Sequence, residues 1–205
     1  MKALALLVII VVVAAVVGDV AAKQVAENRI ASQVEDSIEG VSGVEAEIDA
    51  FPFLPTLLSG ELDGLRMKIA RVRSGGLAVS DLALELRALD FDPVDVFAGD
   101  GAITVGGGKG RAFASAAAIS RALQRAGADA TVAFDGTNAT VSSQGQTVSV
   151  ETVQVSDGAL VFDLPTGPLT LQIPETFESL TYESARVEGG RLRIGIALSG
   201  KRFEL

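Results

Sequence analysis

Hydrophobic residues at the start of the chain follow a helical spacing. Residues 3–18 contain no charged side chain, and beyond them apolar side chains recur at every fourth position between residues 26 and 38. This spacing places the apolar side chains on one face of a helix. Gly40 can end such a helix in the left-handed conformation. The pattern predicts a helix over about residues 20–39 that continues directly from the apolar run.

Apolar and polar residues alternate after this helix. The alternation predicts strands over residues 44–50, 65–73 and 77–91, because successive side chains of a strand point to opposite faces of a sheet. The parity of the alternation changes near residue 70 and again at Asp81. A β-bulge at each of these points would explain the change.

The second half of the chain is rich in turn signals. The glycine-rich segment 106–110 (GGGKG) predicts a mobile hairpin or loop. Ser115 is placed to cap a short helix over about residues 116–126. From residue 130 onward, short alternating segments, one of them residues 146–155, are separated by Asp-Gly, Gly-Gly and Gly-Pro pairs. These are the turn residues of antiparallel hairpins.

These elements predict an α+β fold in which the long N-terminal helix is wrapped by a curved, bulged antiparallel β-sheet, with one further short helix. The long helix is the only predicted element able to cover the apolar face of such a sheet. The chain has 205 residues, which suits one domain over residues 20–205. A signal peptide or membrane anchor is expected over residues 1–19.

Two interpretations of the N-terminal segment remain open. An apolar run of this length lies between the core of a signal peptide and a full membrane span. Small residues such as Gly18 and Ala22 would suit cleavage. Retention as a transmembrane anchor, with Lys2 inside, is favoured because the helical pattern continues from the run. Either alternative places the domain at the outer side of the cytoplasmic membrane or in the periplasmic space, anchored or secreted.

Composition excludes several kinds of chemistry. The chain has no His and no Cys, which excludes Ser-His and Cys-His catalysis and argues against a zinc site. Its net charge of −9 argues against a nucleic-acid partner, because neutralising phosphates requires a basic surface. We therefore expect no catalytic residue, no metal and no cofactor.

Two sequence features resemble ligand sites but have simpler explanations. The segment 106–110 fails the P-loop pattern, because Ile103 stands in place of the first glycine and Gly110 in place of the Ser or Thr that binds magnesium. Asp90, Asp92 and Asp95 lack the glycine and the terminal Glu of a calcium loop, so a solvated loop is the better interpretation.

Two pairs of cations, Arg66 with Lys68 and Arg191 with Arg193, each share one face of a predicted strand. They could meet a lipid phosphate at the mouth of a tunnel. A solvated outer face explains them more simply, since half-buried strands alternate apolar and polar side chains.

The segment 51–60 (FPFLPTLLSG) concentrates large apolar side chains in a proline-containing stretch, where a polar loop would be expected. Two explanations stay open. The segment could fold back and plug the core. It could instead form a gate over an apolar ligand site, because such pockets are lined mainly by hydrophobic side chains.

Several of these segments are similar to the LmeA-like family of phospholipid-binding envelope proteins of actinobacteria. The resemblance rests on residues 51–60, on residues 76–82 (GLAVSDL) and on the ending 189–194 (GGRLRI), and it covers about residues 20–205. It implies a tubular lipid-binding fold with an elongated apolar cavity between helix and sheet. It also implies binding of phospholipid acyl chains, with some members linked to mannan-containing glycolipids, and it offers no catalytic signature.

Together, residues and resemblance predict a non-enzymatic protein that holds phospholipid acyl chains and contacts the membrane through its N-terminal segment. Protein partners are not predicted. A rival interpretation is a structural or assembly protein of the envelope with a filled core, and a carboxylate-dependent hydrolase ranks third. The residues expected to line the lipid tunnel are Ile30, Val34, Ile38, Phe51, Phe53, Leu57, Leu65, Met67, Leu82, Leu84, Leu86, Ile194 and Ile196.

Overall fold

Helix α1 (Lys2–Ser37) is the longest element of the protein. The computed structural model describes residues 2–74, 76–98, 102–173 and 181–204. The helix takes in both the apolar run and the amphipathic stretch, so it begins well before the predicted residue 20. It ends close to the predicted position, just before Gly40, which has a φ of +84°. That left-handed conformation is one that glycine adopts without steric cost.

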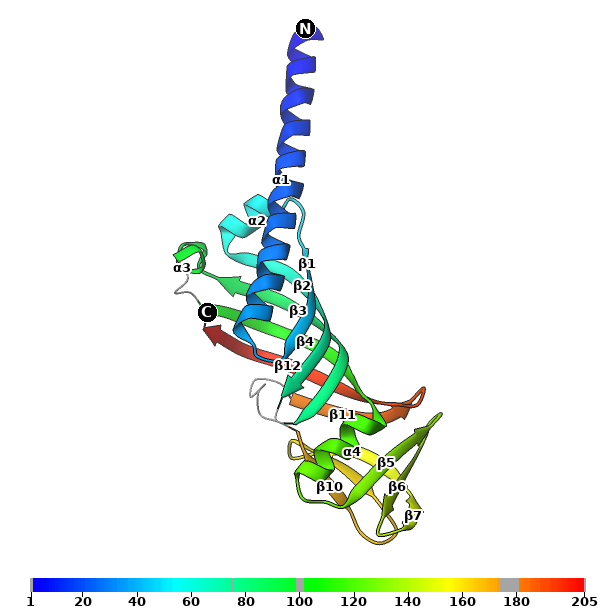
Figure 1. Ribbon diagram of the computed structural model, residues 1–205. Helices are drawn as coiled ribbons and strands as arrows, with labels where there is room; N and C mark the ends of the chain where they lie inside the picture. Colours follow the sequence, from blue (N-terminus) through cyan, green and yellow to red (C-terminus); the bar gives the residue numbers. More distant parts are fainter. Residues whose placement is uncertain (1, 75, 99–101, 174–180, 205) are drawn as a thin grey trace.

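A six-stranded antiparallel sheet forms the body of the molecule (Figure 1). Short helices α2 (Phe53–Ser59) and α3 (Pro93–Ala98) lie in two of its connections. The strand order places β3 and β4 at the centre and leaves β1 and β11 as edges. In spatial order the strands are β1 (Val41–Asp49), β2 (Glu61–Ser74), β3 (Leu77–Phe91), β4 (Ala102–Ala114), β12 (Arg191–Glu204) and β11 (Thr181–Glu188).

Residues 115–173, called the end cap below, lie at the opposite end of the molecule from the N-terminus (Figure 1). Ser115 caps α4 (Ala116–Arg125) as predicted, because its hydroxyl accepts the N–H of Ala118 at 3.2 Å. Two three-stranded sheets complete the end cap. They consist of β5 (Ala130–Asp135), β6 (Asn138–Ser143) and β7 (Gln146–Ser149), and of β8 (Thr152–Ser156), β9 (Ala159–Asp163) and β10 (Leu169–Gln172).

The predicted strand over residues 146–155 is two strands in different sheets. The N–H of Val150 donates to Ala139 O at 2.9 Å, whereas the N–H of Glu151 donates to Asp163 O at 2.8 Å. The hydrogen-bond partners therefore change between consecutive residues, and the chain leaves one sheet and enters the other. Alternation alone cannot reveal such a change of partner.

The side-chain alternation reverses along a line across the large sheet. This line runs through Asp81 of β3, Ala70 of β2 and Gly43 of β1, which lie across from one another in that order. The φ of Asp81 is +50° and the φ of Gly43 is +71°. The register of β1 with β2 and of β2 with β3 is the same on both sides of this line. A register shift occurs beside Asp81, between β3 and β4. The predicted bulge at Asp81 is therefore confirmed, while β2 changes parity near Ala70 without an inserted residue.

The glycine-rich segment 106–110 is not the predicted loop but the middle of strand β4. Gly108 and Gly110 lie across from Leu86 and Leu84 of β3. A Cβ on Gly110 would stand 2.5 Å from Cδ2 of Leu84 and 3.0 Å from the carbonyl oxygen of Ala83. The glycines therefore leave space for leucine side chains of the neighbouring strand, which is a known reason for glycine in a strand.

The fold class is α+β with a large antiparallel sheet, as predicted, but two details of the prediction were wrong. The strands form three sheets, and within the described residues three short helices accompany α1 instead of one. The sheet is not seen to wrap α1. The helix instead lies mainly along the edge strand β1 and against α2.

Candidate functional site

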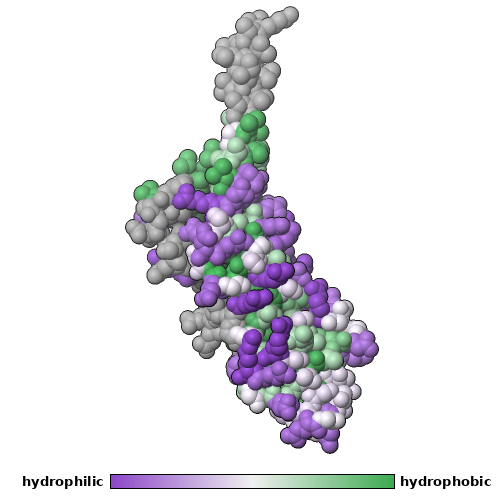
Figure 2. Space-filling model, viewed as in Figure 1, coloured by the Kyte–Doolittle hydropathy of each residue, from purple (hydrophilic) through white to green (hydrophobic). Residues whose placement is uncertain are grey.

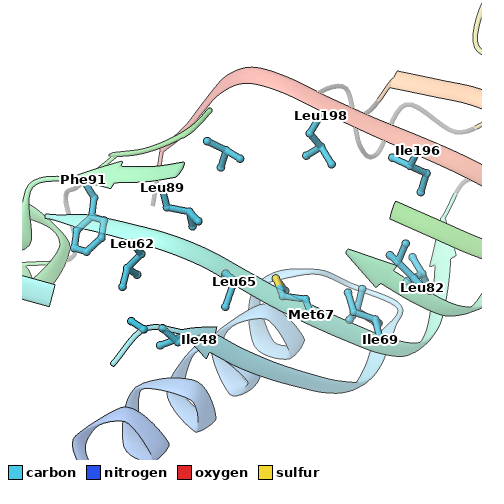
Figure 3. Close-up of a cluster of buried hydrophobic side chains, with 14 of the residues drawn as sticks. Ile48, Leu62, Leu65, Met67, Ile69, Leu82, Leu89, Phe91, Ile196 and Leu198 are labelled. Carbon is cyan, nitrogen blue, oxygen red and sulfur yellow. The ribbon is translucent and has the colours of Figure 1, made fainter. Parts of the chain in front are cut away.

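One face of the six-stranded sheet and the apolar stripe of α1 form a continuous hydrophobic cluster, called the helix–sheet core below. Figure 3 shows members of this cluster on β1, β2, β3 and β12, among them Ile48, Met67 and Leu198. The helical spacing described above brings one residue per turn of α1 onto the cluster. These residues are Ala22, Ala26, Ile30 and Val34, and Ile38, directly after the end of α1, continues the row.

Eleven of the thirteen predicted tunnel residues meet in the helix–sheet core. Ile194 does not, since it packs in the core of the end cap. Phe51 is 73% exposed and lies at the surface. The eleven that the fold brings together are Ile30, Val34, Ile38, Phe53, Leu57, Leu65, Met67, Leu82, Leu84, Leu86 and Ile196.

Two leucines at the centre of the sheet are incompletely covered in the helix–sheet core. Leu84 and Leu86 belong to the central strand β3 and are only partly buried. The residues of β4 that lie across from them are glycines, which add no side chain to this face. Central strands are usually the best covered part of a sheet, because elements packed on the sheet cover its middle. Part of the apolar inner face is therefore left without protein cover.

Helix α2 both fills the core and presents apolar side chains outward. Phe53 is 1% exposed and Leu57 packs on the helix–sheet core, whereas Leu58 is 72% exposed. Gly60 ends the helix in the left-handed conformation, with its N–H donating to Leu57 O. The buried Phe53 agrees with the first explanation of residues 51–60, in which the segment plugs the core. The exposed Leu58 on the other side of the same helix agrees with the second explanation, in which the segment forms a gate.

A carboxylate from α1 caps α2. Asp19, only 6% exposed, accepts the N–H of Phe53 at 2.8 Å through one oxygen and the N–H of Leu54 at 2.7 Å through the other. Pro55 has no N–H, so it needs no partner in the first turn. Sequence reasoning missed this contact, because the two partners are more than thirty residues apart. The available signal was a lone acidic residue at the end of an apolar run.

Two more acidic residues follow Asp19 at intervals of eight along α1 and hold the edge of the sheet. Oε1 of Glu27 accepts the N–H of Ile48 at 2.8 Å, and Oε1 of Glu35 accepts the N–H of Val44 at 2.8 Å. These N–H groups face away from β2, so an unprotected edge would leave them open to pairing with another chain. The acidic side of α1 therefore covers the β1 edge while its apolar side faces the core.

Exposed apolar side chains gather at the end of the domain from which α1 projects. Figure 2 shows them over α2 and the adjoining part of α1, and Figure 1 shows α1 continuing beyond the sheet at this end. We call this set the apolar end. Its members are Val16, Val17, Val20, Phe51, Leu54 and Leu58.

The cation pairs considered in the sequence lie on the solvated face of the sheet. Arg66 pairs with Glu47 at 2.9 Å, and Lys68 lies 4.0 Å from Glu45. Arg191 pairs with Asp81 at 2.6 Å and stacks over the ring of Phe113. These contacts agree with the simpler interpretation of an outer face.

Two further findings concern possible sites of other kinds. No helix within the described ranges combines the length and the apolar character that crossing a membrane requires. Among the described residues, no three acidic side chains are grouped so that they could hold a metal ion. Asp92 has a structural role instead, since its Oδ1 accepts the N–H of Val94 at 2.8 Å at the start of α3.

A long helix lying beside a large antiparallel sheet, with partly buried apolar side chains between them, defines this protein as α+β. Residues 17–196 match the model of the LmeA-like phospholipid-binding family, and the chain belongs to this family. No curated protein and no solved structure matches the chain significantly.

Proposed function

We propose that this protein holds phospholipid acyl chains on the inner face of its large sheet, beside α1, and that it works at the outer side of the cytoplasmic membrane in the upkeep of envelope lipids or lipoglycans. The observation that carries the proposal is the partial exposure of Leu84 and Leu86 at the centre of the sheet. Membership of a phospholipid-binding family supports the choice of ligand.

The energetics favour such a ligand. Each methylene moved from water to an apolar surface contributes about 0.8 kcal/mol. Contact of part of one chain with β3 and α1 would therefore stabilise a complex. Because apolar side chains distinguish poorly between similar chains, we expect tolerance of chain length.

The apolar end supports a membrane contact. Phe51 and Leu58 point outward beside the part of α1 that carries the N-terminal apolar run. We propose that this end touches the bilayer and that lipid enters beneath α2. The rest of the surface carries the net charge of −9, which anionic membrane surfaces repel. The contact would therefore be apolar.

Mass spectrometry of an organic extract of the purified protein tests the proposal directly. We expect phospholipid to be present in the extract. Protein that is repeatedly free of lipid, and that takes up none from liposomes, would instead support the rival interpretation of a structural envelope protein. The full burial of Phe53 is the observation that favours this rival.

A pair of neighbouring substitutions locates the site. Leu86→Gln changes the inner face of β3, whereas Arg87→Gln changes the next residue, which is exposed and points to the outer face. We expect Leu86→Gln to lower the uptake of a fluorescent phospholipid by about tenfold, an amount equal to about 1.4 kcal/mol. Arg87→Gln should leave uptake unchanged. Equal uptake by both variants would place the lipid elsewhere.

A further inference from the structure

A pocket of about 430 Å³ lies where the hairpin between β2 and β3 meets α4. It is at the far end of β2 from α2 and the apolar end, a separation of up to roughly 40 Å at 3.3 Å per strand residue. The pocket is therefore separate from the apolar end, and it shares no lining residue with the helix–sheet core. It is lined by Arg73, Gly76, Leu77, Ala78, Ala118, Arg121 and Arg125.

Three arginines line this pocket from two elements. Arg73 stands near the end of β2, and Arg121 and Arg125 lie one turn apart on α4. Nη1 of Arg125 donates to the carbonyl oxygen of Gly76 at 2.6 Å, and Nε of Arg121 donates to Ala117 O at 3.1 Å. Each contact occupies one of the five N–H donors of a guanidinium. Most donors remain available to a ligand.

The charged residues that line the pocket are all cationic. Among the described residues, no carboxylate oxygen lies within 4.0 Å of Arg73, Arg121 or Arg125, whereas Arg66 and Lys109 both have acidic partners. The chain has 26 acidic and 17 basic residues, so three cations around one pocket run against its composition. Like charges one helical turn apart also oppose each other. An anion in the pocket would relieve this repulsion.

We infer that this pocket binds a phosphate group, either in a phospholipid headgroup or in a soluble phosphate or phosphate ester. Guanidinium groups match phosphate oxygens with paired N–H donors, and three of them suit a group with several charged oxygens. The carbonyl of Gly76 holds Arg125 in place at the rim of the pocket. This site is independent of the acyl-chain site, because no residue of the helix–sheet core lines it.

Calorimetry and thermal unfolding of the full chain at low ionic strength test this inference. We expect inorganic phosphate and glycerol 3-phosphate to bind and to raise the Tm, because a ligand of the folded state stabilises it. Potassium chloride at the same ionic strength serves as the control for screening. The double variant R73Q/R121Q should lose at least tenfold in phosphate affinity and should show no phosphate-dependent rise in Tm.

A matched variant removes the same charge elsewhere. R66Q/K68Q takes two cations from the outer face of β2, where both have acidic partners. This variant should bind phosphate as the unchanged protein does. Without phosphate, R73Q/R121Q should be at least as stable as the unchanged protein, since it loses a repulsion. A loss of fold in R73Q/R121Q can be recognised by circular dichroism, and the single variant R121Q then provides the test.

The source of the phosphate is distinguished with vesicles. Binding of soluble phosphate esters identifies a soluble ligand. Binding that occurs only with vesicles of phosphatidic acid, and not with phosphatidylcholine vesicles or soluble esters, identifies a lipid headgroup. Equal responses to phosphate and chloride, or equal affinities of the two double variants, would overturn the inference. Neither result bears on acyl-chain uptake, which is measured separately with Leu86→Gln.

Discussion

The end cap and the helix–sheet body use the same kinds of aliphatic side chain but cover them to different extents. In the end cap, Ile119, Leu123, Leu160 and Phe162 have no exposed surface. In the helix–sheet core, Leu84 and Leu86 of the central strand β3 and the whole apolar stripe of α1 are only partly buried, although Leu82 of the same strand is 2% exposed. The four end-cap residues are therefore closed to water, whereas these positions of the helix–sheet core are not.

The difference has a structural cause. The end cap packs α4 and two small sheets onto the ends of the large sheet, so its core is covered from several sides. The helix–sheet core has α1 as its main cover, and α1 lies towards the β1 edge. One helix cannot cover the full width of a six-stranded sheet, because helices pack about 8–10 Å from their neighbours whereas six strands span more than 20 Å. The uncovered width is where we propose that lipid lies.

Truncation of one leucine in each core should give the largest difference in the free energy of unfolding. Leu160→Ala removes a fully buried side chain from the end cap and should lower the free energy of unfolding by about 2–5 kcal/mol. Leu86→Ala, on the open face, should cost less than about 1.5 kcal/mol, because water already reaches this side chain. Urea denaturation measures both. Equal costs would mean that the two cores are equally closed.

Glu27→Ala should have the next largest effect. The Glu27 side chain is 11% exposed and satisfies the N–H of Ile48, so its loss leaves a nearly buried donor unpaired at a cost of about 1–3 kcal/mol. Glu35→Ala is the matched control, because Glu35 is exposed and water can replace its contact. Hydrogen exchange at Ile48 should become faster in Glu27→Ala. Unchanged exchange there would show that the contact does not protect the β1 edge.

Asp19→Ala should follow, at about 1–2 kcal/mol, because it removes both N-terminal partners of α2. Asp19→Asn keeps one acceptor oxygen and should recover part of this loss. The effect should be local, with faster hydrogen exchange at Phe53 and Leu54 and unchanged exchange in the end cap. If exchange rises throughout the molecule, Asp19 supports the whole fold and not α2 alone.

Much of this fold follows from local patterns in the sequence. The four-residue spacing on α1 and the alternation of β1, β2 and β3 predicted these elements and eleven of the residues that meet in the helix–sheet core. The change of parity at Asp81 also predicted the bulge. Apolar side chains on both sides of such a change can share one face of the sheet only if the alternation of side-chain direction is interrupted there.

What could not be predicted depends on partners far away in the chain. Glycines 106–110 resemble a loop until Leu84 and Leu86 are known to lie across from them. The role of Asp19 depends on α2, and the break after Val150 depends on two different neighbouring strands. The arginine pocket joins residues from β2 and α4, so no spacing in the sequence identifies it.

Tyr182 provides the smallest and most direct test, because it packs against both cores. It is the only Tyr in a chain without Trp, so its ultraviolet absorbance can be followed alone. Burial raises the pKa of its phenol above the usual value of 10.0. The folded protein therefore holds the proton more tightly than the unfolded chain does. The stability from this group is fully present below about pH 10 and is lost as the pH rises through the raised pKa.

If lipid occupies the open core, it should remove more water from the Tyr182 ring. We then expect a higher pKa in lipid-loaded protein than in lipid-free protein, measured by absorbance titration, because desolvation disfavours the phenolate. Tyr182→Phe should remove this alkaline loss of stability while leaving neutral stability nearly unchanged. Phosphate alone should not shift the titration, since its pocket does not include Tyr182. Identical pKa values with and without lipid would place the ligand away from this boundary between the two cores.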